Sequence, residues 1–360
     1  DPRYDRGRME TRIPGQPWGR PFAGAREGVD ESRFPLSAVD VTLQLQRTGL
    51  AAASDLEPTL RKLASEGVRL VILDLPGKLV ARAAAVADDT GQLLLNTSAA
   101  DDSLREQDCD RHLFHLLPTD AMRMDGLAQY LTERNWKNVL LVAGPRDQDH
   151  AVARAFRTAA KRYGLDIVDE RSFVLGNDPR QRQANNLDIL TRGEDFDVVF
   201  VADADGEFAQ TVPYSTRAPR PVIGSAGLIP TWWHWNWRKH GAPQLNHRFE
   251  RAAGRRMTAY DWSAWLAVKA ITEAVLRTRS TNAMTIADYL RSDRFVLDGF
   301  QGYRLSFRAW NNQLRMAIFL ATPNWVAARA PLPGFLHPQN DLDSLGKGAA
   351  ESTCKLGTGG

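Results

Sequence analysis

Four tryptophans lie within six residues and run directly into basic side chains, which is the clearest chemical signal in the sequence. They are Trp232, Trp233, Trp235 and Trp237, and Arg238 follows them. An indole offers a broad π face and one N–H donor, whereas a guanidinium is a planar fork that suits carboxylates. Together these types predict a site that grips a flat anion. The alternative is that the indoles pack two domains together, or pack a helix against a sheet.

Two more tryptophans and two histidines widen the set of candidates. Trp262 and Trp265 fall on one predicted helix, and we add Trp262 to the stacking candidates; the alternative is that one of this pair packs within its own domain. His234 and His240 have no third ligand at a spacing that suits a metal ion. We therefore expect capping or solvated roles for these histidines, and no metal site.

Length and composition limit the class of protein. A chain of 360 residues is long for one core and predicts two domains. Apolar residues make up 43% and charged residues 25%, as in an ordinary globular protein, and no stretch approaches the roughly 20 apolar residues of a membrane span. The net charge of +3 is too small to indicate a nucleic-acid binder. The chain begins at Asp1 rather than Met, from which we expect a processed or trimmed product.

The only two cysteines are far apart in sequence. Cys109 lies in the first third of the chain and Cys354 in a polar C-terminal segment. No CxxC pair or His/Cys cluster surrounds them. We predict a disulfide that ties the C-terminal segment down in an oxidising compartment, and the alternative is two unrelated free thiols.

Hydrophobic periodicity alternates between strands and helices over the first two thirds of the chain. Strands made of unbroken Val, Ile and Leu between helices are typical of parallel sheets covered on both faces. We therefore predict an α/β, doubly wound fold. The expected strands are 39–45, 68–73, 92–95, 139–142, 167–173, 197–201 and 221–224. The expected helices are 23–31, 55–66 (capped by Ser54), 78–87, 121–134, 150–163 and 180–191.

The last third departs from this alternation. Residues 245–253, 260–277 and 286–292 are predicted helices. Residues 300–307 and 314–321 flank Asn311-Asn312-Gln313, which predicts a hairpin. Beyond about Pro331 the periodicity is lost, and we expect a peripheral tail.

The loops that follow the predicted strands carry small and polar residues. Ligands of open α/β sheets bind beyond the carboxyl ends of the strands, so these loops are the expected binding edge. No loop contains GxGxxG, a phosphate loop, GxSxG or HExxH, so an enzyme is not expected. Aspartates there cap helices or accept hydrogen bonds from a ligand more often than they catalyse. The candidates from these loops are Lys78, Asn96, Thr97, Ser98, Arg146, Asp147 and Asp203.

The order of elements and two stretches carry a family resemblance. Asn96-Thr97-Ser98 is followed by a segment that contains Phe114, Pro118 and Asp120, and Arg248-Phe249-Glu250 leads to Tyr260-Asp261. Over about residues 20–325 the chain resembles the type I periplasmic binding proteins of ABC transporters, closest to the leucine/isoleucine/valine-receptor branch. The family opens with a strand before its first helix, which we expect within residues 1–21 or upstream of Asp1.

The resemblance implies two lobes joined by a three-crossing hinge, which close on a ligand. It places lobe 1 at residues 1–118 and 246–322, lobe 2 at 119–245 and 323–335, and a tail at 336–360. It also implies a periplasmic monomer that binds a small molecule, serves an ABC permease and has no catalytic cofactor.

The ligand implied by the branch is an amino acid, whose ammonium group is held by an acidic residue after a late strand of the second lobe. The matching loop here, Gly224-Ser225-Ala226-Gly227, offers no acid. The sequence also resembles a subfamily associated with quinone-dependent alcohol dehydrogenases, which implies pyrroloquinoline quinone (PQQ) as the ligand and a PQQ-dependent dehydrogenase as a further partner. PQQ is flat and carries three carboxylates, so it suits the Trp/Arg stretch. The alternative ligand is a branched-chain amino acid or another small carboxylate.

Overall fold

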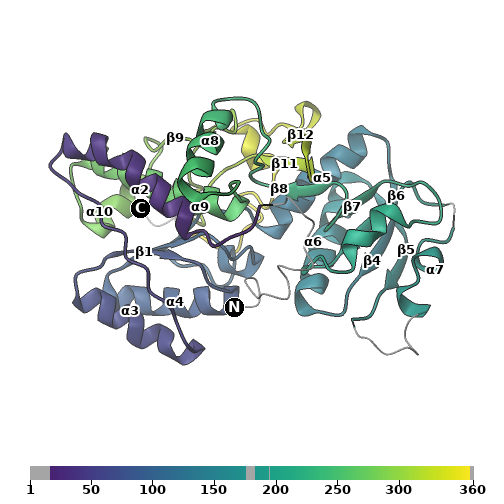
Figure 1. The fold of residues 1–360 in the computed structure, drawn as a ribbon, viewed down its shortest axis with the longest axis horizontal. Coiled ribbons are helices and arrows are strands. Elements are labelled where there is room, and N and C mark those ends of the chain that lie inside the picture. The colour runs from purple at the N-terminus through teal and green to yellow at the C-terminus, as the bar shows by residue number, and fades with distance from the viewer. Residues whose placement is uncertain (1–16, 176–182, 194, 357–360) are drawn as a thin grey trace. The chain divides into compact units, whose positions relative to one another are not determined.

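The computed structural model describes residues 17–175, 183–193 and 195–356, and within them the chain divides into two compact units (Figure 1). Unit 1 contains Asp120–Asn236 and Ala317–Lys347. Unit 2 contains Pro17–Thr119, Trp237–Met316 and the C-terminal segment from Gly348. The chain thus changes unit after Thr119, Asn236, Met316 and Lys347, where the sequence suggested changes after residues 118, 245 and 322.

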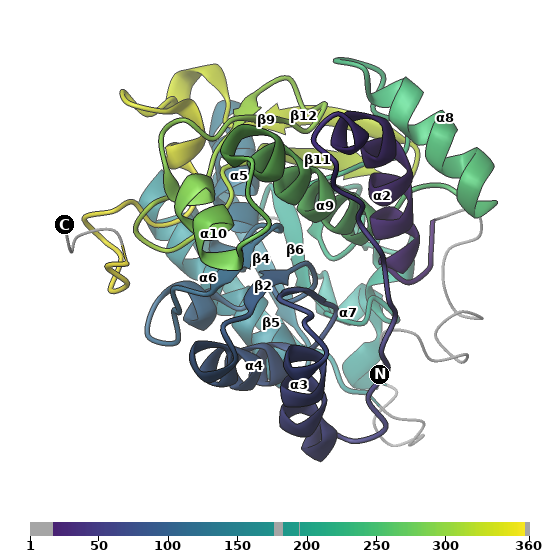
Figure 2. The same ribbon diagram turned by 90° about the vertical axis from the view of Figure 1, so that its left-hand side faces the viewer.

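Unit 2 is built on a short parallel sheet. Its strands β1 (Leu70–Leu73), β2 (Leu93–Asn96) and β3 (Leu113–His115) stand in the order β1-β2-β3. Every residue of β2 and β3 is buried, as expected for unbroken apolar strands of a covered parallel sheet. The helices α3 (Leu56–Ser65) and α4 (Gly77–Thr90) lie side by side in Figure 1 and Figure 2, and their leucine and valine side chains share a core with these strands.

Two long helices of unit 2 pack closely against each other. Helix α2 (Phe22–Ser37) contacts α9 (Ala259–Thr278), as Figure 2 shows. A Cβ atom at Gly24 would lie 1.9 Å from the backbone oxygen of Asp261, and one at Gly28 would lie 2.9 Å from Cβ of Val268. Only glycine allows the two backbones to approach this closely. The rest of unit 2 comprises α8 (Ala242–Ala253), α10 (Ala283–Arg291) and the antiparallel pair β9 (Leu297–Asp298) and β10 (Arg304–Leu305).

Unit 1 contains a four-stranded parallel sheet in the order β5-β4-β6-β7. The central strands β4 (Asn138–Ala143) and β6 (Val198–Ala202) are almost wholly buried, whereas the edge strand β5 (Asp166–Ser172) is mostly exposed and charged. Charges on an edge strand discourage pairing with another chain. The other elements of this half are β7 (Val222–Gly224) and the helices α5 (Asp120–Glu133), α6 (Asp147–Tyr163) and α7 (Leu187–Leu190). These parallel sheets confirm the predicted α/β class.

A second, antiparallel sheet completes unit 1. It places β11 (Ile318–Thr322) between β12 (Trp325–Ala330) and β8 (Ile229–Thr231). The predicted hairpin of residues 300–307 and 314–321 is therefore wrong as a pair of strands. Only Phe307 and Leu314 bridge each other around the Asn311–Gln313 turn, because β11 takes its partners from β8 and β12 instead.

Three further predictions need correction. Residues 39–45 form no regular strand, because no described strand pairs with them, although Leu43 and Leu45 pack on the cluster that contains Ala264. Ser54 does not cap α3, because a 3-10 turn already spans Ala53–Asp55. The helix expected at 180–191 is reduced to α7 within the described residues. Residues 180–182 of that prediction, and residues 1–16 of the expected first strand, lie outside the described residues.

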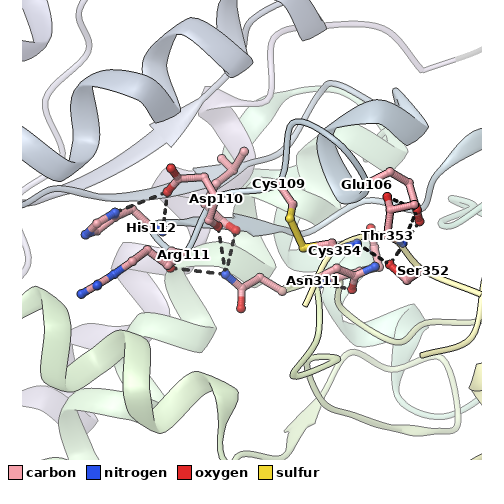
Figure 3. Close-up of a disulfide and its surroundings, with 12 residues drawn as sticks. Glu106, Cys109, Asp110, Arg111, His112, Asn311, Ser352, Thr353 and Cys354 are labelled. Carbon is pink, nitrogen blue, oxygen red and sulfur yellow. Dashed lines mark hydrogen bonds and ion pairs between the residues drawn. A yellow bond between two sulfur atoms is a disulfide. The ribbon is translucent and has the colours of Figure 1, made fainter. Parts of the chain in front are cut away.

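The C-terminal segment is not a peripheral tail. Leu342, Leu345 and Cys354 are each at most 1% exposed. Cys354 forms a disulfide with Cys109, with an S–S distance of 2.04 Å, so the predicted pairing is confirmed (Figure 3). The lack of periodicity does not predict this burial, because the segment is anchored by single buried side chains, which leave no repeating pattern.

Candidate ligand-binding site

Polar side chains lie at the carboxyl edge of the parallel sheet in unit 1, in the segments that follow the neighbouring strands β4, β6 and β7. Asp149 is fully buried and joins two of these segments: its Oδ2 accepts from the backbone N–H of Arg146 at 3.0 Å, and its Oδ1 accepts from Ala204 N–H at 2.7 Å. Both oxygens are thus used by the fold. Gly144 sits against this carboxylate, since a Cβ there would lie 2.3 Å from Oδ2 of Asp149.

Asp203 differs from Asp149 because, among the described residues, only one of its two carboxylate oxygens accepts a hydrogen bond. It directly follows β6, is only 2% exposed, and accepts a hydrogen bond from Ala209 N–H at its Oδ2, at 2.9 Å. Its own N–H donates to the hydroxyl oxygen of Ser225, in the loop after β7, at 2.9 Å. Its Oδ1 is buried and has no hydrogen-bond donor within the part of the chain that the structure describes. One oxygen of this buried carboxylate is therefore without a hydrogen-bond donor among the described residues.

The other two predicted residues of this edge are less buried. Arg146 directly precedes α6 and pairs with Asp205, whose side chain is 8% exposed. Asp147 is the exposed first residue of α6, where a carboxylate is favoured by the helix dipole. The loops thus bring Arg146 and Asp203 to one edge. Ser225 joins them and is not among the predicted ligand-binding residues. Its position in the loop after β7, another parallel strand of this sheet, is the sequence signal that points to it.

In unit 2 the hydroxyl and amide groups predicted to bind the ligand are already hydrogen-bonded to the backbone. Asn96 accepts from Ala99 N–H and donates to Ala99 O, both within 2.9 Å. Thr97 donates to Leu73 O, and Ser98 donates to Leu75 O. Asn96 and Thr97 have no exposed surface, and these hydrogen bonds hold the loop after β2 against the loop after β1. Lys78, in the first turn of α4, is exposed.

A buried polar cluster lies behind this loop and had no signal in the sequence. Arg105, 2% exposed, donates to the backbone oxygens of Ala99 and Leu117 and to the side chain of Gln313. The imidazole of His115 accepts from the Asn96 amide at Nδ1, at 3.1 Å. Burial, reinforced by the charge of Arg105, holds the pKa of His115 well below its usual value. His115 is thus neutral and structural.

The tryptophan stretch is mostly packed away. Trp232, Trp233 and Trp237 are at most 8% exposed, and Trp235 is half-buried. The indole N–H of Trp237 donates to Phe300 O at 3.1 Å. Arg238 is exposed. Trp232 to Trp235 belong to unit 1, and Trp237 begins the next segment of unit 2.

The remaining aromatic and histidine candidates have structural partners. Trp262 has no exposed surface and donates from its indole to Gly299 O at 3.0 Å; Trp265 donates to Glu31. His234 contacts Thr322 O through Nε2, and its Nδ1 accepts from Asn236 N–H, which is the capping type of role that the sequence suggested. Among the described residues no group of His, Cys, Asp or Glu could hold a metal ion, and no described helix is long and apolar enough to cross a membrane.

A separate open depression of unit 2 contains none of the predicted ligand-binding residues. It encloses about 680 Å³ and is lined by His240, Asp298, Tyr303 and Arg304, together with Val296, Leu297 and Gly302.

Residues 58–328, more than half of the chain, match the sequence model of the family described as periplasmic binding protein. The chain belongs to this family. It is a family of binding proteins and not of enzymes, and its solute-binding members serve ABC transporters. No curated protein matches the chain.

Solved structures of periplasmic binding proteins share the fold. A branched chain amino acid ABC transporter periplasmic ligand-binding protein from Burkholderia xenovorans has a TM-score of 0.75 at 13% identity, over 93% of this chain and 94% of that one. A branched-chain amino acid transporter substrate binding protein from Streptococcus pneumoniae, in complex with isoleucine, gives 0.66 at 19%, over 86% and 92%. A solute binding protein from R. palustris, in complex with benzoate, gives 0.68 at 11%, over 92% and 94%. The predicted two-lobed fold of the leucine/isoleucine/valine-receptor type is confirmed.

Proposed function

We propose that this protein captures an amino acid, or a related small carboxylate that carries a positively charged nitrogen, for an ABC transporter. The observation that carries the proposal is Oδ1 of Asp203, at the carboxyl edge of the parallel sheet in unit 1, which has no hydrogen-bond donor among the residues that the structure describes. This edge is where open α/β sheets bind their ligands. The family supplies the transport role, and Asp203 suggests the chemistry of the solute.

A buried carboxylate oxygen without a donor is unfavourable. Leaving such a group unsatisfied costs about 1–3 kcal/mol, and more for a charged group. Ala209 N–H donates to Oδ2, and among the described residues no group donates to Oδ1, so a donor for Oδ1 has to come from a ligand. An ammonium group would supply three N–H donors and a compensating charge. The neighbouring Ala204 is exposed, so the carboxylate lies next to the surface of this loop.

The similar structures are consistent with this class of solute but do not choose within it. One is in complex with isoleucine, which carries an ammonium group, and another with benzoate, which does not. A protein that recognises the ammonium group through Asp203 should discriminate between these two solutes.

Isothermal titration calorimetry with leucine, isoleucine, valine and benzoate tests the proposal. We expect saturable binding of at least one amino acid and none of benzoate. Asp203→Asn keeps an acceptor for Ala209 N–H but removes the charge, so it should weaken amino-acid binding by about 1.5–3 kcal/mol, a factor of roughly 10 to 150 in Kd. The melting temperature of the unliganded variant should be unchanged or higher, because an uncompensated buried charge is gone.

Asp166→Asn is the matched control. It makes the same chemical change at an exposed position where β5 begins, at the opposite edge of the same sheet. Binding equal to that of the wild type is expected. Amino-acid affinity that survives Asp203→Asn, or benzoate binding as tight as leucine binding, would contradict the proposal.

PQQ is the second candidate, favoured by one feature of the tryptophan stretch. Trp235 is only half-buried, so part of its indole is available for a flat tricarboxylate to stack on, and the exposed Arg238 follows three residues later in the sequence. Titration with PQQ, followed by tryptophan fluorescence, tests this ligand. Saturable one-to-one quenching by PQQ, with no calorimetric response to any amino acid, would replace the first proposal by the second.

We further propose that the protein works in the periplasm. A disulfide between residues far apart in sequence supports an oxidising compartment. Pull-down with the ABC permease, compared with a PQQ-dependent dehydrogenase, distinguishes delivery for uptake from delivery to an enzyme.

A further inference from the structure

Within the described residues, the C-terminal segment connects the two units once more, after the connections that follow Thr119, Asn236 and Met316. The chain leaves unit 1 after Lys347 and continues in unit 2 from Gly348. This segment can restrain the motion of the two units only if it is firmly held on each side of this point.

On the unit 1 side the segment is fixed by a buried carboxylate. Oδ2 of Asp125 accepts from Gly346 N–H at 2.7 Å and from the guanidinium of Arg162 at 2.8 Å. Arg162 also donates to Gly346 O, and Tyr163 donates from its hydroxyl to Ser344 O at 3.0 Å. Burial raises the pKa of Tyr163 to about 12, so this donor keeps its proton at any physiological pH. Gly346 is thus bonded through both its N–H and its carbonyl.

On the unit 2 side the segment is fixed covalently. The disulfide joins Cys354 to Cys109, and Figure 3 shows Glu106 beside it. The carboxylate of Glu106 accepts from the N–H and hydroxyl of Thr353, both at 2.8 Å, and from the Ser352 hydroxyl at 3.3 Å. The buried Ser352 therefore marks the start of this anchor.

Only residues 347–351 separate the two anchors. A fully extended chain spans at most about 3.6 Å per residue, so the six steps from Gly346 to Ser352 reach about 20 Å. We propose that residues 347–351 form a strap whose greatest length limits how far the two units can move apart, with the Cys109–Cys354 disulfide holding its far end. Ser352 N–H donates to Gly348 O at 3.0 Å, so the strap is folded into a turn that has to open before this length is reached. Reduction of the disulfide would leave the strap held in unit 2 by hydrogen bonds alone.

The test lengthens the strap while keeping both anchors. About ten Gly and Ser residues are inserted between Gly348 and Ala349 in a chain that carries spin labels on Lys161→Cys in unit 1 and Thr281→Cys in unit 2, both exposed. Pulsed electron–electron double resonance then gives the distribution of distances between the two spin labels. The insertion adds a flexible span of about 15–20 Å, so the longest distances should increase by up to that amount.

Two controls separate the strap from general effects on the fold. An equal insertion after Gly67, an exposed turn of unit 2 with no neighbour within 4 Å of a Cβ built there, should leave the distances unchanged. Cys109→Ser combined with Cys354→Ser should broaden the distribution, as the lengthened strap does. The labels report on the units whichever solute binds, so this outcome is independent of the proposed function.

Unchanged distances in the lengthened strap would overturn the proposal. Broadening in the cysteine variant alone would overturn it as well, because the disulfide would then act on the folding of unit 2 rather than on the strap.

Discussion

His115 makes the stability of unit 2 depend on pH in a direction that its surroundings dictate. Its ring is buried, and Nδ1 accepts from the Asn96 amide, so protonation there would place two donors face to face. Burial and the charge of Arg105 hold the pKa of His115 well below 6.5. In the unfolded chain the same imidazole takes up a proton near pH 6.5. The unfolded state therefore binds more protons below pH 6.5, and the free energy of unfolding falls as the pH falls.

The size of the effect follows from proton linkage. One proton bound only by the unfolded state changes the free energy of unfolding by about 1.4 kcal/mol per pH unit. Between pH 6.5 and pH 5.5, His115 alone should thus remove about 1 kcal/mol, and the loss continues at lower pH until the folded protein also takes up the proton. Above pH 7 the contribution of His115 is constant.

Urea unfolding of the unliganded protein, measured at several values between pH 7.5 and 5, checks this slope. His115→Gln should be less stable at pH 7 but should lose less stability on acidification than the wild type. The control is His150→Gln, at an exposed position of α6, which should keep the wild-type slope. The reasoning is wrong if His115→Gln and the wild type fall in parallel, or if the His115 ring titrates near pH 6.5 in the folded protein by NMR.

Three further substitutions test packing and the second ligand candidate. Gly24→Ala should lower the free energy of unfolding by about 3 kcal/mol or more, because its Cβ would meet the Asp261 backbone oxygen at 1.9 Å. The control is Gly49→Ala, whose Cβ would have no neighbour within 4 Å and which should have little effect in the same urea assay. Equal stabilities of the two variants would refute the close approach of α2 and α9. If PQQ binds, Trp235→Ala and Arg238→Ala should each weaken it by about 1–3 kcal/mol through lost stacking and a lost charged hydrogen bond. Unchanged fluorescence titrations in both variants would remove this stretch from the site.

Most helices and parallel strands were predictable, because each rests on a local pattern. The strands β4 and β6 are runs of Val, Leu and Phe between helices, and α9 follows apolar positions from Ala259. The pairing of Cys109 with Cys354 was also within reach, since the chain has only two cysteines. The β11 pairing was not, because strands that contact distant segments choose partners through side-chain packing that sequence spacing does not record.

The candidate site divides in the same way. The sequence could place Asp203 and Arg146 at the carboxyl edge of a parallel sheet, since that edge follows from the order of strands and loops. It could not distinguish Asp149, with both oxygens used by backbone N–H groups, from Asp203, with one oxygen left over. Nor could it tell that Trp237 and Trp262 are buried while Trp235 is only half-buried.

By itself, then, the sequence determined the α/β class and the loops that form a binding edge, because these follow from periodicity and chain order, and its motifs resemble those of the binding-protein family. Only the tertiary structure decided which polar groups are already satisfied and which are not, and it alone revealed that Gly346 and Cys354 anchor the last segment at two separate places. Hydrogen-bond satisfaction and burial are properties of neighbours in space, and residues as distant as Asp125 and Gly346 become neighbours only when the chain has folded.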